Sequence, residues 1–174
     1  MTEHIGRRSH RTNACKPSKS SDNSTMATVN LPPDFKEFLR LLKAHQVEYL
    51  LIGGYAVAYH GYPHATADMD IWIAVHPQNA ERIVAALNEF GFDLPALTPE
   101  LFLKEGQIIR MGVPPVRIEI ATTISGVKFT ECYAARVVEV WDEVEVNLIS
   151  LAHLKANKKA AGRYKDLNDL ENLP

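Results

Sequence analysis

Two pairs of residues that could do chemistry lie where two apolar runs of the sequence end and begin. Gly53 and Gly54 follow the run that ends at Ile52, and Asp68 and Asp70 open the next run. Because successive side chains of a strand alternate between its faces, both aspartates are expected on one side, close enough to share divalent cations. Two neighbouring carboxylates repel each other unless a cation lies between them. The bare backbone N–H groups of a glycine pair at a helix start suit a phosphate. This combination indicates chemistry on a nucleoside triphosphate.

Glu119 is the best candidate for a third acid of the same site. In the run Val116–Ala121 the residues Val116, Ile118 and Ile120 form an apolar face, so Glu119 is expected on the opposite face. If this strand lies beside the one that opens at Asp68, three carboxylates converge. Hard oxygen ligands suit Mg²⁺, with Mn²⁺ as a possible substitute. Two such ions can stabilise the attacking and leaving oxygens of a displacement at phosphorus. We therefore expect Asp68 and Asp70 to hold one ion and Glu119 to join them around a second.

Composition favours one soluble domain and argues against a generic polyanion-binding protein. The 174 residues carry a net charge of −2, and no apolar run approaches the ~20 residues that span a bilayer. Residues 1–30 have a net charge of +3, which leaves −5 for the rest. The two cysteines, Cys15 and Cys132, have no zinc-site spacing, which argues against a zinc site. Such sparing use of cysteine suits a reducing, cytoplasmic location.

The chain divides into a polar leader and a folded body. Residues 1–30 are rich in Ser, Thr, Asn, Lys and Arg, so we expect a disordered basic tail. Met26 is an alternative start, in which case residues 1–25 are not part of the native protein. Residues 31–174 form one predicted folded domain.

The body alternates strand-like and helix-like patterns. A mixed sheet flanked by helices, with further helices at the C-terminal end, is therefore expected: an α/β fold of the α+β sandwich kind. Strands are predicted at 49–52, 69–75, 107–111, 116–121, 137–141 and 144–148, and helices from Pro33, over 53–60, from Pro77 to Gly91, at 98–100, over 151–161 and over 164–173.

These motifs together resemble the nucleotidyltransferase superfamily of the DNA polymerase β type, and most closely its small bacterial and archaeal members. The resemblance covers roughly residues 35–173 and extends to the segments Gly61–Thr66 and Ala156–Leu167. It implies a minimal nucleotidyltransferase core that uses Mg²⁺ to transfer a nucleoside monophosphate from a triphosphate such as ATP to a hydroxyl acceptor on RNA (for example tRNA) or protein. The nucleotide-binding residues that it implies are Gly53, Gly54, Thr66, Lys158 and Lys165.

Three positions depart from the pattern of that superfamily. Many members have Ser where Gly54 stands, with the hydroxyl on the triphosphate, and many have Arg where His64 stands. Asp is commoner than Glu at position 119. None of these departures removes a metal ligand, but together they bear on substrate choice and turnover.

Other readings of the same residues stay open at this stage. The fold can be kept by a catalytically weak nucleotide-binding protein or by a toxin–antitoxin partner, and a toxin-type enzyme would have an antitoxin partner. Metal-dependent glycosyltransferases use the same Asp-x-Asp doublet, although their sugar-nucleotide domain is usually larger than this body. Trp72 could stack on a base but is expected in the core. The cationic residues near the C-terminus can bind phosphate or complement helix dipoles: Lys155, Lys158, Lys159, Arg163 and Lys165.

Overall fold

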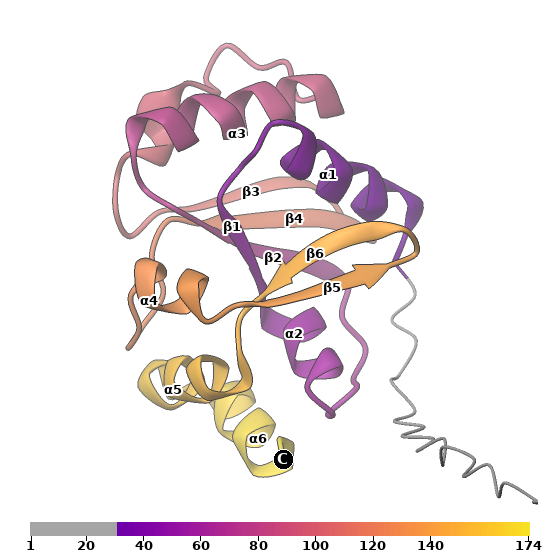
Figure 1. Ribbon diagram of the computed structural model, residues 1–174, viewed down its shortest axis with the longest axis vertical. Coiled ribbons are helices and arrows are strands. Elements are labelled where there is room, and N and C mark those ends of the chain that lie inside the picture. Colours follow the sequence, from indigo (N-terminus) through magenta and orange to yellow (C-terminus); the bar gives the residue numbers. More distant parts are fainter. Residues whose placement is uncertain (1–30) are drawn as a thin grey trace, which may run out of the picture.

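A computed structural model describes residues 31–174 as a six-stranded mixed sheet with helices on both of its faces (Figure 1). The predicted basic tail and the alternative start at Met26 lie outside these residues. In chain order the elements are α1 (Pro33–Ala44), β1 (Tyr49–Ile52), α2 (Gly53–Tyr59), β2 (Asp68–Ile73), α3 (Pro77–Phe90), the 3₁₀ turn η1 (Pro99–Phe102), β3 (Ile108–Val113), β4 (Val116–Ala121), α4 (Phe129–Ala134), β5 (Val137–Trp141), β6 (Val144–Leu148), α5 (Leu151–Ala161) and α6 (Tyr164–Asn172). The predicted α+β fold is confirmed. None of the helices in residues 31–174 has the length and apolar character needed to cross a bilayer.

The order of strands brings the predicted acids together. The sheet runs β3-β4-β2-β1-β6-β5, and β2 pairs in parallel with β4. In this register Asp70 lies opposite Glu119, and Asp68 lies opposite Arg117. Neighbouring residues on paired strands point to the same face. The condition set by the sequence, that the strand bearing Glu119 lies beside the one that opens at Asp68, is therefore met.

The side chains on the two faces of β2 lie in different environments. Met69, Ile71 and Ile73 are fully buried in the main apolar core, beneath α1 and α3. Asp68, Asp70 and Trp72 point the other way, towards the face covered by α2, α4, α5 and α6 (Figure 1). The prediction that Trp72 is a core residue is confirmed, since its indole is buried and packs edge-on against Phe129 of α4.

Most element boundaries agree with the predicted ones to within two residues. α4 was not predicted, because its six residues are too few to show a helical period. Ser150 caps α5 by accepting a hydrogen bond from the His153 N–H, and Gly162 ends that helix in the left-handed conformation. α6 follows at once and packs against α5, so the two C-terminal helices form one unit beside the sheet.

Gly53 makes the turn from β1 into α2 that the site requires. Its φ of +63° lies in the left-handed region, and a Cβ at this position would lie 1.9 Å from Asp70 Oδ2. Position 53 therefore requires glycine for two reasons: the backbone conformation, and the close approach of the Asp70 side chain.

Gly53→Ala should destabilise the protein by more than the cost of placing an alanine in the left-handed backbone conformation. Gly106 offers a matched control, since its φ is +73° and a Cβ there would meet nothing within 4 Å. We expect Gly106→Ala to lower the free energy of unfolding by about 1–2 kcal/mol and Gly53→Ala by about 3 kcal/mol or more, because the second also displaces Asp70. Denaturant titration measures both values. Equal losses in the two variants would mean that Asp70 does not pack on Gly53.

Candidate functional site

The predicted site residues all line one cleft of about 450 Å³ between the sheet and the C-terminal helices. β2 and β4 contribute the acids, the β1–α2 turn contributes the glycines, and α5 and α6 contribute cations. The eight residues are Gly53, Gly54, Thr66, Asp68, Asp70, Glu119, Lys158 and Lys165. The structure thus brings them together, while their roles in binding and catalysis are still predictions.

Asp70 is the most perturbed acid of the cleft. Burial, followed by the negative charge of Glu119, raises its pKa from the ordinary 3.8 to about 6. Asp68 acts in the same direction, while Lys165 and the Gly54 backbone N–H favour the charged form. The carboxylate of Asp70 therefore lies where its negative charge is incompletely compensated by the protein.

Two arginines form ion pairs with the other two acids of the cleft, Asp68 and Glu119. Arg117 donates a hydrogen bond to Asp68 Oδ2, and its Nη2 lies 3.6 Å from Glu119 Oε1. Arg110 Nε donates to the same Glu119 oxygen over 2.8 Å. With the carboxylates turned to these partners, residues 31–174 contain no group of three His, Cys, Asp or Glu side chains gathered as ligands of one ion. Crowded carboxylates adopt this arrangement because pairing with arginine relieves their mutual repulsion.

The donor set nevertheless suits a hard divalent cation. Asp68 Oδ1 is buried and has no hydrogen-bond partner within the described part of the chain, so one oxygen of this carboxylate is unpaired while Arg117 holds the other. The charge of Asp70 is incompletely compensated, and Glu119 is its direct neighbour on β4. Carboxylate oxygens of this kind are preferred ligands of Mg²⁺. The residues therefore fit the predicted metal.

Thr66 explains why glycine stands at position 54. A Cβ on Gly54 would lie 2.6 Å from Thr66 Oγ1 and 2.7 Å from Thr66 Cβ, so the threonine fills the space that a serine at 54 would need. The Thr66 hydroxyl lines the cleft and donates to the backbone oxygen of Asp68 over 3.2 Å. A hydroxyl is thus present in this region, but it comes from residue 66.

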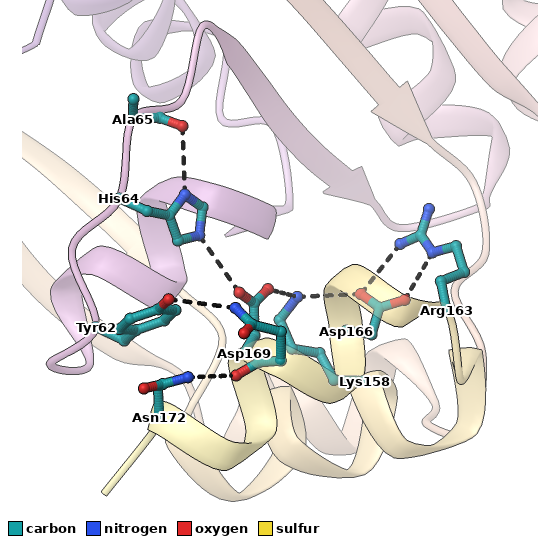
Figure 2. A network of polar contacts seen from close by, with 9 residues as sticks. Tyr62, His64, Ala65, Lys158, Arg163, Asp166, Asp169 and Asn172 are labelled. Carbon is teal, nitrogen blue, oxygen red and sulfur yellow. Dashed lines mark hydrogen bonds and ion pairs between the residues drawn. The ribbon is translucent and has the colours of Figure 1, made fainter.

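The cations of the C-terminal helices differ in their exposure and in their partners. Lys158 was expected to contact phosphate, but its ammonium is buried between two carboxylates of α6, those of Asp166 and Asp169 (Figure 2). Arg163 was only one member of the basic cluster in the sequence. Its largely exposed guanidinium lines the cleft, and so does the exposed side chain of Lys165, two residues further along the chain.

His64 lies beside α6. Many members of the superfamily that the sequence resembles have Arg at this position, and here the His64 Nε2 faces Asp169 Oδ1 at 3.6 Å (Figure 2). The loop between α2 and β2 is thereby joined to α6. No pattern in the sequence indicates this contact, because residues 64 and 169 meet only through the packing of the last helix.

Comparisons with known proteins support the fold. Among solved structures, a proposed nucleotidyltransferase from Thermotoga maritima superposes with a TM-score of 0.55 at 15% identity, covering 79% of this chain and 88% of that one. An antigenic nucleotidyltransferase-like protein from Paracoccidioides brasiliensis gives a TM-score of 0.49 at 16% identity, covering 79% and 72% of the two chains. No known family model matches the sequence, and no curated protein is significantly similar to it. The likeness to the Thermotoga protein establishes a nucleotidyltransferase-like fold.

Asp70→Asn should stabilise the metal-free protein, and only above acidic pH. A carboxyl group whose pKa is raised on folding favours the folded state below its unfolded pKa, near 3.8, and loses that contribution as the pH rises to about 6. The raised pKa corresponds to about 3 kcal/mol, which the amide avoids. We expect the variant to match wild type near pH 4 and to exceed it by about 2–3 kcal/mol at pH 8 in the presence of a chelator.

Chemical denaturation at several pH values tests this expectation. The exposed Asp93 provides the control, because Asp93→Asn removes the same charge outside the cleft. A stability difference between Asp70→Asn and wild type that did not change with pH would contradict the account.

Proposed function

We propose that this protein is a Mg²⁺-dependent nucleotidyltransferase, which transfers a nucleoside monophosphate from a nucleoside triphosphate to a hydroxyl acceptor on RNA or protein. The observation that carries the proposal is one cleft that holds three carboxylates from β2 and β4 and two accessible cations, Arg163 and Lys165. Carboxylates suit metal ions, and cations suit a polyphosphate. The nucleotidyltransferase-like fold supports the same activity.

The acids would hold the metal ions on the sheet side of the cleft. Mg²⁺ or Mn²⁺ bound by Asp68, Asp70 and Glu119 would stabilise charge on the transferred phosphoryl group and lower the pKa of the acceptor hydroxyl. Asp68 and Glu119 would exchange an arginine for an ion, while Asp70 would gain the compensating charge that it lacks.

The cations and the neutral residues of the cleft would hold the rest of the nucleotide. Arg163 and Lys165 would orient the triphosphate, and the Thr66 hydroxyl and the backbone of Gly53 and Gly54 would contact it from the sheet side. The remaining lining includes uncharged side chains that suit a nucleoside, namely Ile108, Ala121, Thr123, Ile124, Ser125 and Asn157.

The second candidate function is a catalytically weak nucleotide-binding protein, including a partner in a toxin–antitoxin pair. The observation that favours it is the pairing of Asp68 and Glu119 with arginines, which a metal ion must displace. Both functions share the nucleotide site and differ in turnover, so a transfer assay separates them.

Glu119→Gln should abolish transfer and leave nucleotide affinity within a few-fold of wild type, because the acid acts mainly in the transition state. Lys165→Ala should instead weaken triphosphate binding by about 1–3 kcal/mol if it makes a charged hydrogen bond to phosphate. The measurement pairs nucleotide titration with incubation of each labelled NTP, Mg²⁺, bulk tRNA and cell extract.

Glu37→Gln is a matched control. Glu37 is exposed on α1, so this substitution removes the same charge at a position away from the cleft. A wild type that binds a triphosphate, labels nothing in any acceptor pool and behaves as Glu119→Gln does would exclude the enzyme. The nucleotide-binding protein would then be the correct account.

A further inference from the structure

A buried ion cluster joins the two C-terminal helices beside the cleft. Lys158 Nζ of α5 lies 2.6 Å from Asp169 Oδ2 and 3.1 Å from Asp166 Oδ1, both on α6 (Figure 2). Lys158 is only 5% exposed, and each aspartate is 2% exposed. Arg163, at the start of α6, adds a second cation, with its Nε 2.6 Å from Asp166 Oδ2. Two cations and two carboxylates thus neutralise one another, with Lys158 and both aspartates buried and the Arg163 side chain largely exposed.

The cluster is stable only while its charges balance. Burial alone would raise the pKa of Asp166, but hydrogen bonds from Arg163 and Lys158 lower it below its ordinary value. Removing one partner of a buried ion pair leaves an uncompensated charge and is strongly destabilising. The positive charge of Lys158 is therefore committed to the two aspartates.

A phosphate group would meet poor conditions at Lys158. Two of the three directions in which an ammonium can donate already lead to carboxylates. Asp166 also lines the cleft, so an anion that approached Lys158 from there would be repelled by that carboxylate. Arg163 and Lys165 have the exposed positions that an anion needs.

The same cluster connects both walls of the cleft. Asp166 and Asp169 lie three residues apart, on the face of α6 that meets α5. Lys165 directly precedes Asp166 in the chain. His64 reaches Asp169 from the loop that leads to Thr66 and Asp68 (Figure 2). Holding α6 against α5 and this loop fixes where Arg163 and Lys165 stand relative to the acids.

We propose that Lys158 is a positioning residue of the nucleotide site, which acts by fixing α6 through Asp166 and Asp169, and that Arg163 and Lys165 are the side chains that contact the triphosphate. This assignment rests on the proposed nucleotide-binding function. It replaces the expectation from sequence that Lys158 itself binds phosphate.

A charge-balanced double variant separates a positioning role from direct binding. Lys158→Met leaves two buried carboxylates with one cation, whereas Lys158→Met combined with Asp169→Asn leaves the balanced Arg163–Asp166 pair. Lys159→Met is the control, because Lys159 is exposed on the same helix. Lys165→Met removes a proposed phosphate contact without touching the cluster.

Thermal melts and titrations with each NTP in the presence of Mg²⁺ supply the two readouts. Lys158→Met should lower the melting temperature and weaken nucleotide binding, and the double variant should recover most of both, to within about threefold of the wild-type affinity. Lys165→Met should keep the wild-type melting temperature and bind about tenfold or more weakly. Lys159→Met should resemble wild type in both readouts.

The outcome that overturns the assignment is a double variant that regains its melting temperature but binds nucleotide at least tenfold more weakly than wild type does, since a direct ligand cannot be rescued by removing its partner. If Lys158→Met alone does not fold, the double variant still decides between the two roles. A wild type that binds no triphosphate would refute the proposed function itself. Loss of binding in the double variant alone would refute only the role given to Lys158.

Discussion

The site is built around the placement of one carboxylate, that of Asp70, between a glycine turn and a second acid. Gly53 lets the side chain pack against the backbone where β1 becomes α2, and the parallel register of β2 and β4 sets Glu119 beside it. The carboxylate is partly buried there and lacks a full counter-charge, as the raised pKa of Asp70 shows. The rest of the cleft can be understood as the means by which this charge is balanced.

Two sources of positive charge surround the acids. On the sheet, Arg110 and Arg117 pair with Glu119 and Asp68 across neighbouring strands. On α6, Lys165 favours the charged form of Asp70 from the other wall. Binding of a metal ion and a triphosphate would change these pairings. The ion would bind the carboxylates, and the phosphates would bind the cationic side chains. The proposed function depends on this exchange.

The sequence was most informative where chemistry depends on local spacing. The period of two in Asp68-Met69-Asp70 placed both acids on one face, and the apolar alternation of Val116–Ala121 placed Glu119 opposite the core. It could not show which strands pair, so the arginine partners of the acids were not predicted. Arg110, for example, meets Glu119 only through the β3–β4 register.

The cationic helices show the limit of the same reasoning. Lys158 and Lys165 look alike in a basic stretch of sequence, but one is buried between two aspartates and the other is exposed at the cleft. That difference depends on how α5 packs on α6, which spacing alone does not determine. The packing of α6 also places His64 against Asp169.

The most direct test of the account is a crystal structure of the protein with Mn²⁺ and a non-hydrolysable triphosphate, recorded with anomalous scattering from manganese. We expect a manganese peak at coordination distance from carboxylate oxygens of Asp68 and Asp70. The triphosphate should contact Arg163 and Lys165, and Arg117 should have moved away from Asp68. A triphosphate bound elsewhere, or a cleft in which Arg117 still pairs with Asp68 and no manganese is present, would contradict the proposed site.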